Sequence, residues 1–210
     1  MDNGLCLQNL AISLRGRELV RLNADIPPGQ ILTVMGPSGS GKSTLLAAIT
    51  GTLPREFSLA GRVVLDGEDV TRLATERRRI GILFQDDMLF PHLSVGANLA
   101  FGLKADIRGQ QARRAAVDAA LADVGLAGFA DRDPATLSGG QKARVSLMRV
   151  LLAEPRALLL DEAFSKLDAE LRAHVRRLVF DTAASNGLPV LQVTHDEADA
   201  QDAGGVVHRL

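Results

Sequence analysis

Cysteine and aromatic residues are scarce in this sequence, and long apolar runs are absent. Cys6 is the single cysteine among 210 residues, which excludes an internal disulfide and any zinc or iron–sulfur site built on several cysteines. Trp and Tyr do not occur, and the aromatic share of 3% is entirely Phe. No apolar run approaches the roughly 18–20 residues that span a membrane. The start of the chain, residues 1–6, lacks the basic and apolar stretches of an export signal. These absences predict a soluble domain in a reducing compartment.

An excess of one charge is also missing. The 24 basic and 25 acidic residues leave a formal net charge of -1, which gives no general reason to bind nucleic acid or anionic lipid. The apolar share of 46% and the charged share of 23% are those of a globular protein, so a disordered or fibrous chain is excluded. The basic run Arg77-Arg78-Arg79 is interpreted as a solvated face, because three charges do not make a nucleic-acid patch.

Short apolar runs alternate with helical stretches along the chain. Apolar strands separated by helices indicate a parallel sheet covered on both faces, and hence an α/β fold. The predicted strands are Ile31–Met35, Arg62–Leu65, Ile80–Phe84, Ala157–Leu160 and Pro189–Val193, and the tail has room for one short strand more. Between the third and the fourth of these strands only helical patterns occur, including residues 110–124. We expect one domain over residues 1–210, with 1–85 and 157–210 as the α/β core and about 86–156 as a helical subdomain.

A glycine-rich segment follows the first of these strands and opens a helix. It fits the phosphate-binding pattern G-x-x-x-x-G-K-[ST] with Gly36, Pro37, Ser38, Gly39, Ser40, Gly41, Lys42, Ser43 and Thr44. Its glycines let backbone N–H groups converge on phosphate oxygens at a helix N-terminus. Lys42 would reach the β- and γ-phosphates, and the Ser43 hydroxyl would bind Mg²⁺. The alternative is a chance glycine-rich turn, which the flanking strand and helix disfavour. The sequence therefore predicts binding of a nucleoside triphosphate.

Polar side chains end three of the predicted strands. Asp161 and Glu162 lie at the carboxyl end of the fourth, where ligands sit in an open α/β sheet. Asp161 suits a Mg²⁺ ligand, and Glu162 suits a general base that polarises the attacking water. Gln85 could bind Mg²⁺ and the lytic water, and His195 could hydrogen-bond the γ-phosphate. The alternative for each is an ordinary polar loop or capping residue.

A second cradle-like segment, Leu137-Ser138-Gly139-Gly140-Gln141, precedes the helical run Lys142–Ala153. A Ser followed by two glycines at a helix start is again an anion-binding geometry. One triphosphate needs only one cradle, so the second is interpreted as completing a site on another copy of the chain. A simple helix cap is the alternative.

Together these motifs resemble the ATP-binding subunit of ATP-binding-cassette (ABC) transporters, over nearly the whole chain. The family's order is kept, with Walker A at Gly36–Thr44, the Gln85 loop, the signature Leu137–Gln141, Walker B ending in Asp161-Glu162, the D-loop Ser165–Asp168 and the His195 switch. The resemblance implies a P-loop NTPase (RecA-like) parallel-sheet core with an all-helical signature subdomain.

It also implies a head-to-tail homodimer that binds two ATP with Mg²⁺. Each ATP would lie between Walker A of one chain and Ser138, Gly139, Gly140 and Gln141 of the other. Glu162 would act as base with Lys42, Gln85 and His195 around the γ-phosphate, while Ser43, Gln85 and Asp161 would hold Mg²⁺. Asp168 would lie at the dimer seam.

Importer-type ATPases are the most similar branch. That likeness implies a subunit at the cytoplasmic face of the cell membrane, bound to membrane permease subunits through loop 86–95 and served by a solute-binding protein. The apolar residues Met88, Leu89 and Phe90 are either groove residues for a permease helix or local core. An export or lipoprotein-release ATPase, or a soluble ABC protein outside transport, is the alternative. The transported solute is not encoded here, because its pocket belongs to other polypeptides.

Three positions depart from the family's pattern. No aromatic residue precedes Phe57, so Leu14 or Arg15 stands where the family stacks an aromatic ring on adenine, which predicts a weak preference for ATP over GTP. Ala163 replaces the usual Pro and Lys166 the usual Ala near the seam. Neither replacement removes a catalytic group.

Overall fold

The computed structural model describes residues 4–210, so the first half of the chain start considered above lies outside the described residues. The chain forms two compact units. The core unit comprises the described residues up to Ile82, Arg156–Glu162 and Phe180–Leu210, and the helical unit comprises Leu83–Pro155 and Ala163–Val179. The sequence placed residues 163–179 in the α/β core. They are counted with the helical unit, where Leu178 packs against the apolar cluster of the helices.

A five-stranded sheet of order β6-β7-β8-β3-β9 carries the core unit. Its strands are β3 (Ile31–Met35), β6 (Ile80–Phe84), β7 (Ala157–Asp161), β8 (Val190–Thr194) and β9 (Val206–Arg209). The pairs β3/β8, β7/β8 and β3/β9 are parallel. The predicted parallel sheet is thus confirmed, and β9 is the short strand predicted for the tail.

The prediction for Arg62–Leu65 as a strand of that sheet is wrong. These residues end β4 (Phe57–Leu65), which belongs to a second, antiparallel sheet of order β2-β1-β4-β5. The other strands are β1 (Leu5–Leu14), β2 (Arg17–Ile26) and β5 (Glu68–Asp69). β1 and β2 form a hairpin whose two turn residues, Arg15 and Gly16, both have positive φ, as the turns that match strand twist require.

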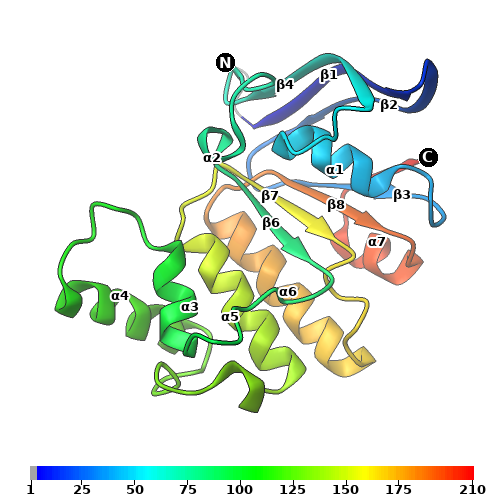
Figure 1. The fold of residues 1–210 in the computed structure, drawn as a ribbon. Helices are drawn as coiled ribbons and strands as arrows, with labels where there is room; N and C mark the ends of the chain where they lie inside the picture. The colour runs from blue at the N-terminus through cyan, green and yellow to red at the C-terminus, as the bar shows by residue number, and fades with distance from the viewer. Residues whose placement is uncertain (1–3) are drawn as a thin grey trace. The chain divides into compact units, whose positions relative to one another are not determined.

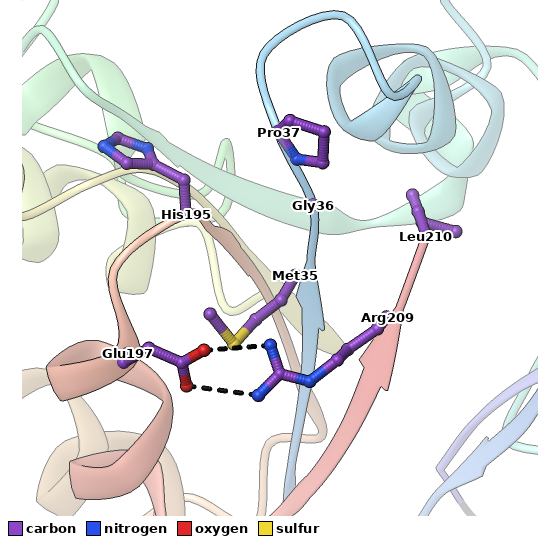
Figure 2. A pocket seen from close by; sticks show the side chains of 7 residues that line it. All are labelled: Met35, Gly36, Pro37, His195, Glu197, Arg209 and Leu210. Atoms are coloured by element: carbon purple, nitrogen blue, oxygen red, sulfur yellow. Dashed lines mark hydrogen bonds and ion pairs between the residues drawn. The ribbon is translucent and has the colours of Figure 1, made fainter.

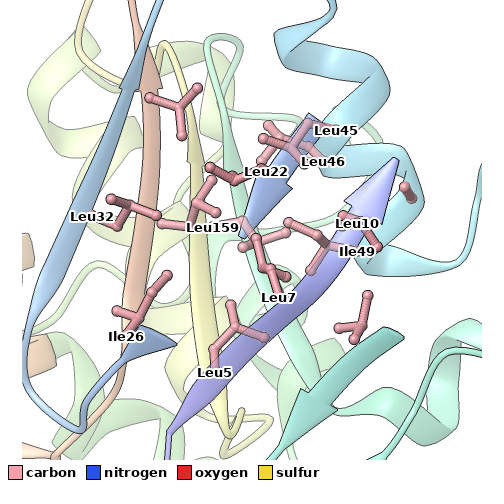
Figure 3. Close-up of a cluster of buried hydrophobic side chains, with 14 of the residues drawn as sticks. Leu5, Leu7, Leu10, Leu22, Ile26, Leu32, Leu45, Leu46, Ile49 and Leu159 are labelled. Carbon is pink, nitrogen blue, oxygen red and sulfur yellow. The ribbon is translucent and has the colours of Figure 1, made fainter. Parts of the chain in front are cut away.

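Helix α1 (Lys42–Thr50) lies between the two sheets (Figure 1). Its residues Leu45, Leu46 and Ile49 share one buried cluster with β1, β2, β3 and β7. Figure 3 draws them in this cluster with Leu7 and Leu10 of β1, Leu22 of β2, Leu32 of β3 and Leu159 of β7. Because close-packed side chains fix the helix from both sides, its N-terminus is held at the end of β3. The helix stops at Gly51, as predicted, with φ +82°.

The prediction of a solvated face for Arg77–Arg79 is wrong at its middle residue. Arg78, the last residue of α2 (Thr75–Arg78), is only 4% exposed. Its Nη1 donates to the carbonyl oxygens of Ala48 (2.9 Å) and Ile49 (2.7 Å) in the last turn of α1. A charged donor here satisfies carbonyls that the helix itself leaves unpaired, and it complements the negative end of the helix dipole.

The helical unit is built on α3 (Val95–Gly102), α4 (Gln110–Asp123) and α5 (Gly139–Leu151), with the 3₁₀ turn Pro134–Thr136 before α5. They enclose an apolar cluster that includes Val95, Leu99, Leu121 and Val145. α6 (Ala169–Ser185) begins in this unit and ends in the core unit, which also holds α7 (Glu197–Ala203). Within residues 4–210, no helix is both long and apolar enough to cross a membrane.

Candidate active site

The glycine-rich loop follows β3 and leads into α1, as its sequence predicted. Gly39 and Gly41 have φ of +82° and +95°, which only glycine adopts without strain. A Cβ on Gly41 would lie 2.4 Å from Val20 Cγ2, so space as well as conformation requires glycine there. No side chain of residues 4–210 caps the start of α1, which leaves its first N–H groups to an outside acceptor. The loop is therefore shaped for an anion.

Lys42 reaches back over this loop. Its Nζ donates to the carbonyl oxygens of Gly36 (2.7 Å) and Pro37 (3.0 Å), and the side chain is buried. The same ammonium lies 3.6 Å from Glu162 Oε1. Ser43, next in α1, is exposed at the helix start. One cation thus links the phosphate loop to the carboxylate predicted to be the base.

Glu162 directly follows β7 in a left-handed conformation, with φ +48°. For a residue with a side chain this backbone is unfavourable, and such strain concentrates at functional sites. Its N–H donates to Val193 O (3.1 Å) on β8, which holds the turn in place. Its Oε2 lies 3.2 Å from His195 Nδ1. A carboxylate only accepts, so a hydrogen bond between these two groups requires the proton on Nδ1.

Asp161, the last residue of β7, has a raised pKa. Burial raises it first and the neighbouring Glu162 charge second, while Lys42 lowers it. Two adjacent carboxylates next to one ammonium leave an excess of negative charge at this strand end. A hard divalent cation with oxygen ligands would relieve that repulsion. No cluster of three His, Cys, Asp or Glu ligands occurs within the described part of the chain. The donor set therefore fits Mg²⁺ that takes most of its ligands from phosphate and water.

A hollow of about 280 Å³ lies beside the loop (Figure 2). It is lined by the start of the phosphate loop, by His195, and by α7 and β9, where Arg209 Nη1 and Nη2 donate to Glu197 at 2.9 and 3.2 Å. This bond lowers the pKa of the Glu197 carboxyl. The core unit thus gathers Lys42, Asp161, Glu162 and His195 around the phosphate loop, and His195 also lines the hollow.

The other predicted site residues belong to the helical unit. Gln85 is exposed directly after β6, and the loop behind it is ordered by buried Asn98. Asn98 Oδ1 accepts from Phe90 N (2.7 Å), and its Nδ2 donates to the carbonyl oxygens of Phe90 and Leu93. Arg149 on α5 donates to Met88 O (2.8 Å). Sequence reasoning missed both anchors, whose only signal is a polar side chain within a helical pattern.

Met88, Leu89 and Phe90 are predicted either as groove residues or as local core, and the structure treats them differently. Leu89 packs against the apolar cluster of the helical unit, so the local-core interpretation is correct for it. Met88 is 59% exposed. The Phe90 ring packs at a tilt against the ring of Phe101, with 4.9 Å between centroids, and Phe101 is 71% exposed. An exposed apolar patch of this kind is typical of an interaction surface.

The signature segment starts α5, three residues earlier than predicted, because Ser138 caps the helix. The Ser138 hydroxyl accepts from Gln141 N (3.4 Å), and Gln141 Oε1 accepts from Ser138 N (3.0 Å), a reciprocal capping box. A Cβ on Gly140 would lie 2.4 Å from Leu171 Cδ1, so the Leu171 side chain would have to shift to admit one. Gly139 is exposed, and its nearest neighbour would be 3.7 Å away, so nothing described here forbids a side chain.

Asp168 and Lys166 lie before α6. Asp168 Oδ1 accepts from Leu171 N (3.0 Å) and caps the helix. Lys166, one of the departures from the family's pattern, forms an ion pair with Asp86 beside Gln85. Burial raises the pKa of Asp87, next in that loop. The D-loop and the glutamine loop are thus joined by a pair that the sequence alone did not predict.

A parallel sheet that feeds a glycine-rich loop into a helix, with a lysine, two carboxylates and a histidine around it, defines a P-loop NTPase. The chain also matches the family model described as "ABC transporter" over residues 19–165. It therefore belongs to the ABC transporter family, as an ATP-binding subunit with ATPase activity.

Three relatives show how far the likeness extends. The chain is 50% identical to an uncharacterized ABC transporter ATP-binding protein, YnjD, of Escherichia coli K12, over 93% of this chain and 90% of that protein. It is 41% identical to the Fe(3+) ions import ATP-binding protein FbpC 1 of Haemophilus influenzae, over 93% of this chain and 59% of that protein. It is 44% identical to the sulfate/thiosulfate import ATP-binding protein CysA of Xanthomonas campestris pv. campestris, over 85% of this chain and 52% of that protein. The chain thus spans little more than half the length of the two import proteins.

Proposed function

We propose that this chain hydrolyses Mg²⁺-ATP to drive solute uptake, as the paired ATPase subunit of an ABC importer. The two units together would form the single domain of residues 1–210. The observation that carries the proposal is the contact of Glu162 with both Lys42 and His195 at the mouth of the phosphate loop. A base held between a phosphate-binding cation and an imidazole is arranged for attack of water on a γ-phosphate.

The nucleotide would lie on the loop Gly36–Thr44, with its phosphates on the N-terminus of α1. Lys42 would exchange the two carbonyl oxygens that it now contacts for β- and γ-phosphate oxygens. Ser43, Asp161 and Gln85 would hold Mg²⁺, which when bound neutralises charge on the phosphates. Glu162 would orient and deprotonate water, and His195 would donate to the γ-phosphate. The adjacent carboxylates of Asp161 and Glu162 support a cation at this place, since the Glu162 charge, after burial, helps to raise the pKa of Asp161.

The second cradle would act on the partner's nucleotide. In the proposed head-to-tail homodimer, Ser138, Gly139, Gly140 and Gln141 of one protomer would cover the ATP bound to the other, with Asp168 at the seam. Gly139 supports this arrangement, because it is exposed and its own chain leaves room for a side chain. A glycine that the fold does not require is explained when an outside group approaches the backbone closely.

The membrane partner would dock on the loop of residues 86–95. Exposed Met88 and the Phe90–Phe101 pair supply an apolar surface, and Asn98 and Arg149 keep the loop in one conformation. A helix with an apolar face suits such a surface. The subunit would then lie on the cytoplasmic face of the cell membrane, beneath permease subunits that receive solute from a binding protein.

Uptake is favoured over release by the relatives, since two of those above are named import proteins for Fe(3+) and for sulfate or thiosulfate. An export or lipoprotein-release ATPase would share the same catalytic geometry. The near-zero net charge of -1 disfavours a nucleic-acid function.

The test of the catalytic proposal is Glu162→Gln, which keeps the shape of the side chain but removes the base. Size exclusion with light scattering should show an ATP-dependent dimer that persists, whereas ADP should leave monomers. Glu76→Gln, the same change at an exposed glutamate of α2, should behave like the unmodified chain. Turnover of ATP by Glu162→Gln at the unmodified rate would refute the assignment of the base.

The missing adenine-stacking aromatic gives a further prediction. The turn residue Arg15 is exposed and Leu14 is half-buried at the end of β1, and neither offers a ring. Loss of such a stack weakens base selectivity by about 0.5–1.5 kcal/mol. Competition binding should therefore show ATP and GTP within about one order of magnitude of each other. Strong adenine selectivity would contradict this prediction.

A further inference from the structure

The imidazole of His195 is poorly supported by its own packing. Its side chain is 56% exposed, so neighbouring side chains do not enclose the ring. Its 3.2 Å contact with Glu162 therefore depends on how the backbone of the β8–α7 turn, Thr194–Asp196, is held. A shift of about 1 Å in such a group is enough to impair catalysis strongly.

That turn is anchored by a buried carboxylate on α7. Thr194 and Asp199 are each 2% exposed, and the Thr194 hydroxyl donates to Asp199 Oδ2 at 3.2 Å. The same hydroxyl accepts from Asp196 N at 3.0 Å. A hydroxyl can donate one hydrogen bond, and the Thr194 hydroxyl donates its own to the Asp199 carboxylate. Thr194 and Asp196 flank His195, so one carboxylate fixes both neighbours of the imidazole.

The rest of the α7–β8 contact is also polar. Gln192 lies two residues before Thr194 on the same face of β8, and its Nε2 donates to Asp199 O at 3.2 Å. The residues that α7 buries are Asp199 and the small Ala200. Apolar packing alone therefore does not define how α7 sits on this face. Directional hydrogen bonds to Asp199 do, and burial strengthens them.

We propose that Asp199 is a positioning residue for ATP hydrolysis, which acts through Thr194 to hold the His195 imidazole against Glu162. The inference rests on the proposed function, because it needs His195 to take part in hydrolysis. Asp199 itself does not touch the nucleotide. Its loss should lower kcat while leaving ATP affinity almost unchanged.

The test compares Asp199→Ala with Asp199→Asn in the full-length chain, by steady-state ATPase rate and by binding of a fluorescent ATP analogue. Asp199→Ala should lower kcat about 10- to 100-fold with the nucleotide Kd within about twofold. Asp199→Asn should stay within about threefold of the unmodified kcat, because its amide oxygen can still accept from Thr194. Asp202→Ala, at an exposed position of the same helix, is the matched control.

A second pair of variants guards against misfolding of Asp199→Ala. Thr194→Ser keeps the hydroxyl and should behave like the unmodified chain, whereas Thr194→Val should reproduce the loss of kcat. An unchanged kcat in both Asp199→Ala and Thr194→Val would overturn the proposal, whatever happens to the melting temperature.

The decisive comparison is made in a His195→Ala background. There Asp199→Ala should cause no further loss of kcat, because Asp199 contributes to hydrolysis only by positioning the imidazole that His195→Ala has already removed. If Asp199→Ala lowered kcat there by the same factor as in the unmodified chain, Asp199 would act by a route that does not pass through His195. That result would overturn this inference but leave the proposed function intact. An undiminished kcat in His195→Ala itself would refute the proposed role of His195 in hydrolysis. The inference for Asp199 would then fall with it.

Discussion

Two helices of this protein, α1 and α5, begin in opposite ways. α1 starts behind Gly41 at φ +95°, and no side chain in the described range 4–210 caps it. α5 starts behind Ser138, and the capping box pairs two N–H groups from within, those of Ser138 and Gln141. Both starts are glycine-rich and both suit an anion. Only the first start has no side-chain cap.

The difference suggests how the two cradles divide the work. The donors of α1 are ready for phosphate in a single protomer. At α5 the Gln141 N–H is engaged with the Ser138 hydroxyl, in a hydrogen bond that is long at 3.4 Å and so weak. An exchange of this bond for a phosphate oxygen costs little when a partner brings one. We therefore expect ATP to bind first at α1 and to be sensed second at α5 of the partner.

The largest expected effect comes from Lys42→Ala, which removes the cation from the α1 cradle. Hydrolysis should fall by about 10²–10³-fold or more, because a buried donor to the reacting phosphate is lost. The affinity of the Lys42→Ala protomer for ATP, measured by isothermal titration calorimetry, should also be weaker than that of the unmodified chain. Lys104→Ala in the helical unit is the control. An unchanged ATP affinity in Lys42→Ala would break the assignment of α1 as the first cradle.

Arg78→Ala should have the next largest effect, on stability. The C-terminal carbonyls of α1 accept from this guanidinium, whereas α5 ends with backbone bonds from Leu152 to Met148 and Val150. Loss of a buried charged donor should lower the free energy of unfolding by about 2–4 kcal/mol in urea titrations. Exposed Arg77→Ala should change it by less than about 0.5 kcal/mol. Equal destabilisation by both would contradict this account of α1.

Ser138→Ala sharpens the comparison from the α5 side. The lost cap should cost about 1 kcal/mol of stability. ATP binding to a protomer should stay unchanged, while ATP-dependent dimerisation and hydrolysis should be lost. Ser138→Thr, which keeps the hydroxyl, should retain much of both. If Ser138→Ala weakened ATP binding as strongly as Lys42→Ala, the two cradles would not be distinct.

The smallest effect is a pH dependence at the α1 cradle. The pKa of Asp161 is raised in the folded protein, chiefly by burial. The folded state then holds this proton more tightly than the unfolded state, so stability is lost as pH rises from the ordinary carboxyl range through the raised pKa. Asp161→Asn should escape this loss. Its melting temperature without nucleotide should exceed that of the unmodified chain by a few degrees at neutral pH, and the gain should vanish below about pH 4. Asp25→Asn, at an exposed position, should show no such trend.

Local patterns made part of this structure predictable. The glycine spacing of the phosphate loop, the apolar runs of β3, β6, β7 and β8, and the cap residue Gly51 are each determined within a few residues. They placed Lys42 in the phosphate loop and Glu162 and His195 after strand ends, and these three side chains do meet in the core unit.

The parts that failed depend on distant partners. Arg62–Leu65 reads as a buried strand whichever sheet it joins, and only β1 decides that it is antiparallel. Arg78 is one of three identical neighbours, and only the carbonyls of α1, about thirty residues earlier, distinguish it. Asp199 reads as a surface acid of an amphipathic helix until β8 places Thr194 against it. The roles of Ser138 and Asp168 in a dimer are still predictions.

The central claim is that one reaction site needs α1 of one protomer and α5 of its partner, and mixing two inactive variants tests it most directly. Lys42→Ala damages the first cradle and Ser138→Ala the second, so each homodimer lacks both working sites. An equal mixture should regain ATPase activity, up to about a quarter of the unmodified rate, since half of the dimers then hold one intact site. If the mixture stays as inactive as its components while the two variants demonstrably associate, each protomer contains its whole site and the account is wrong.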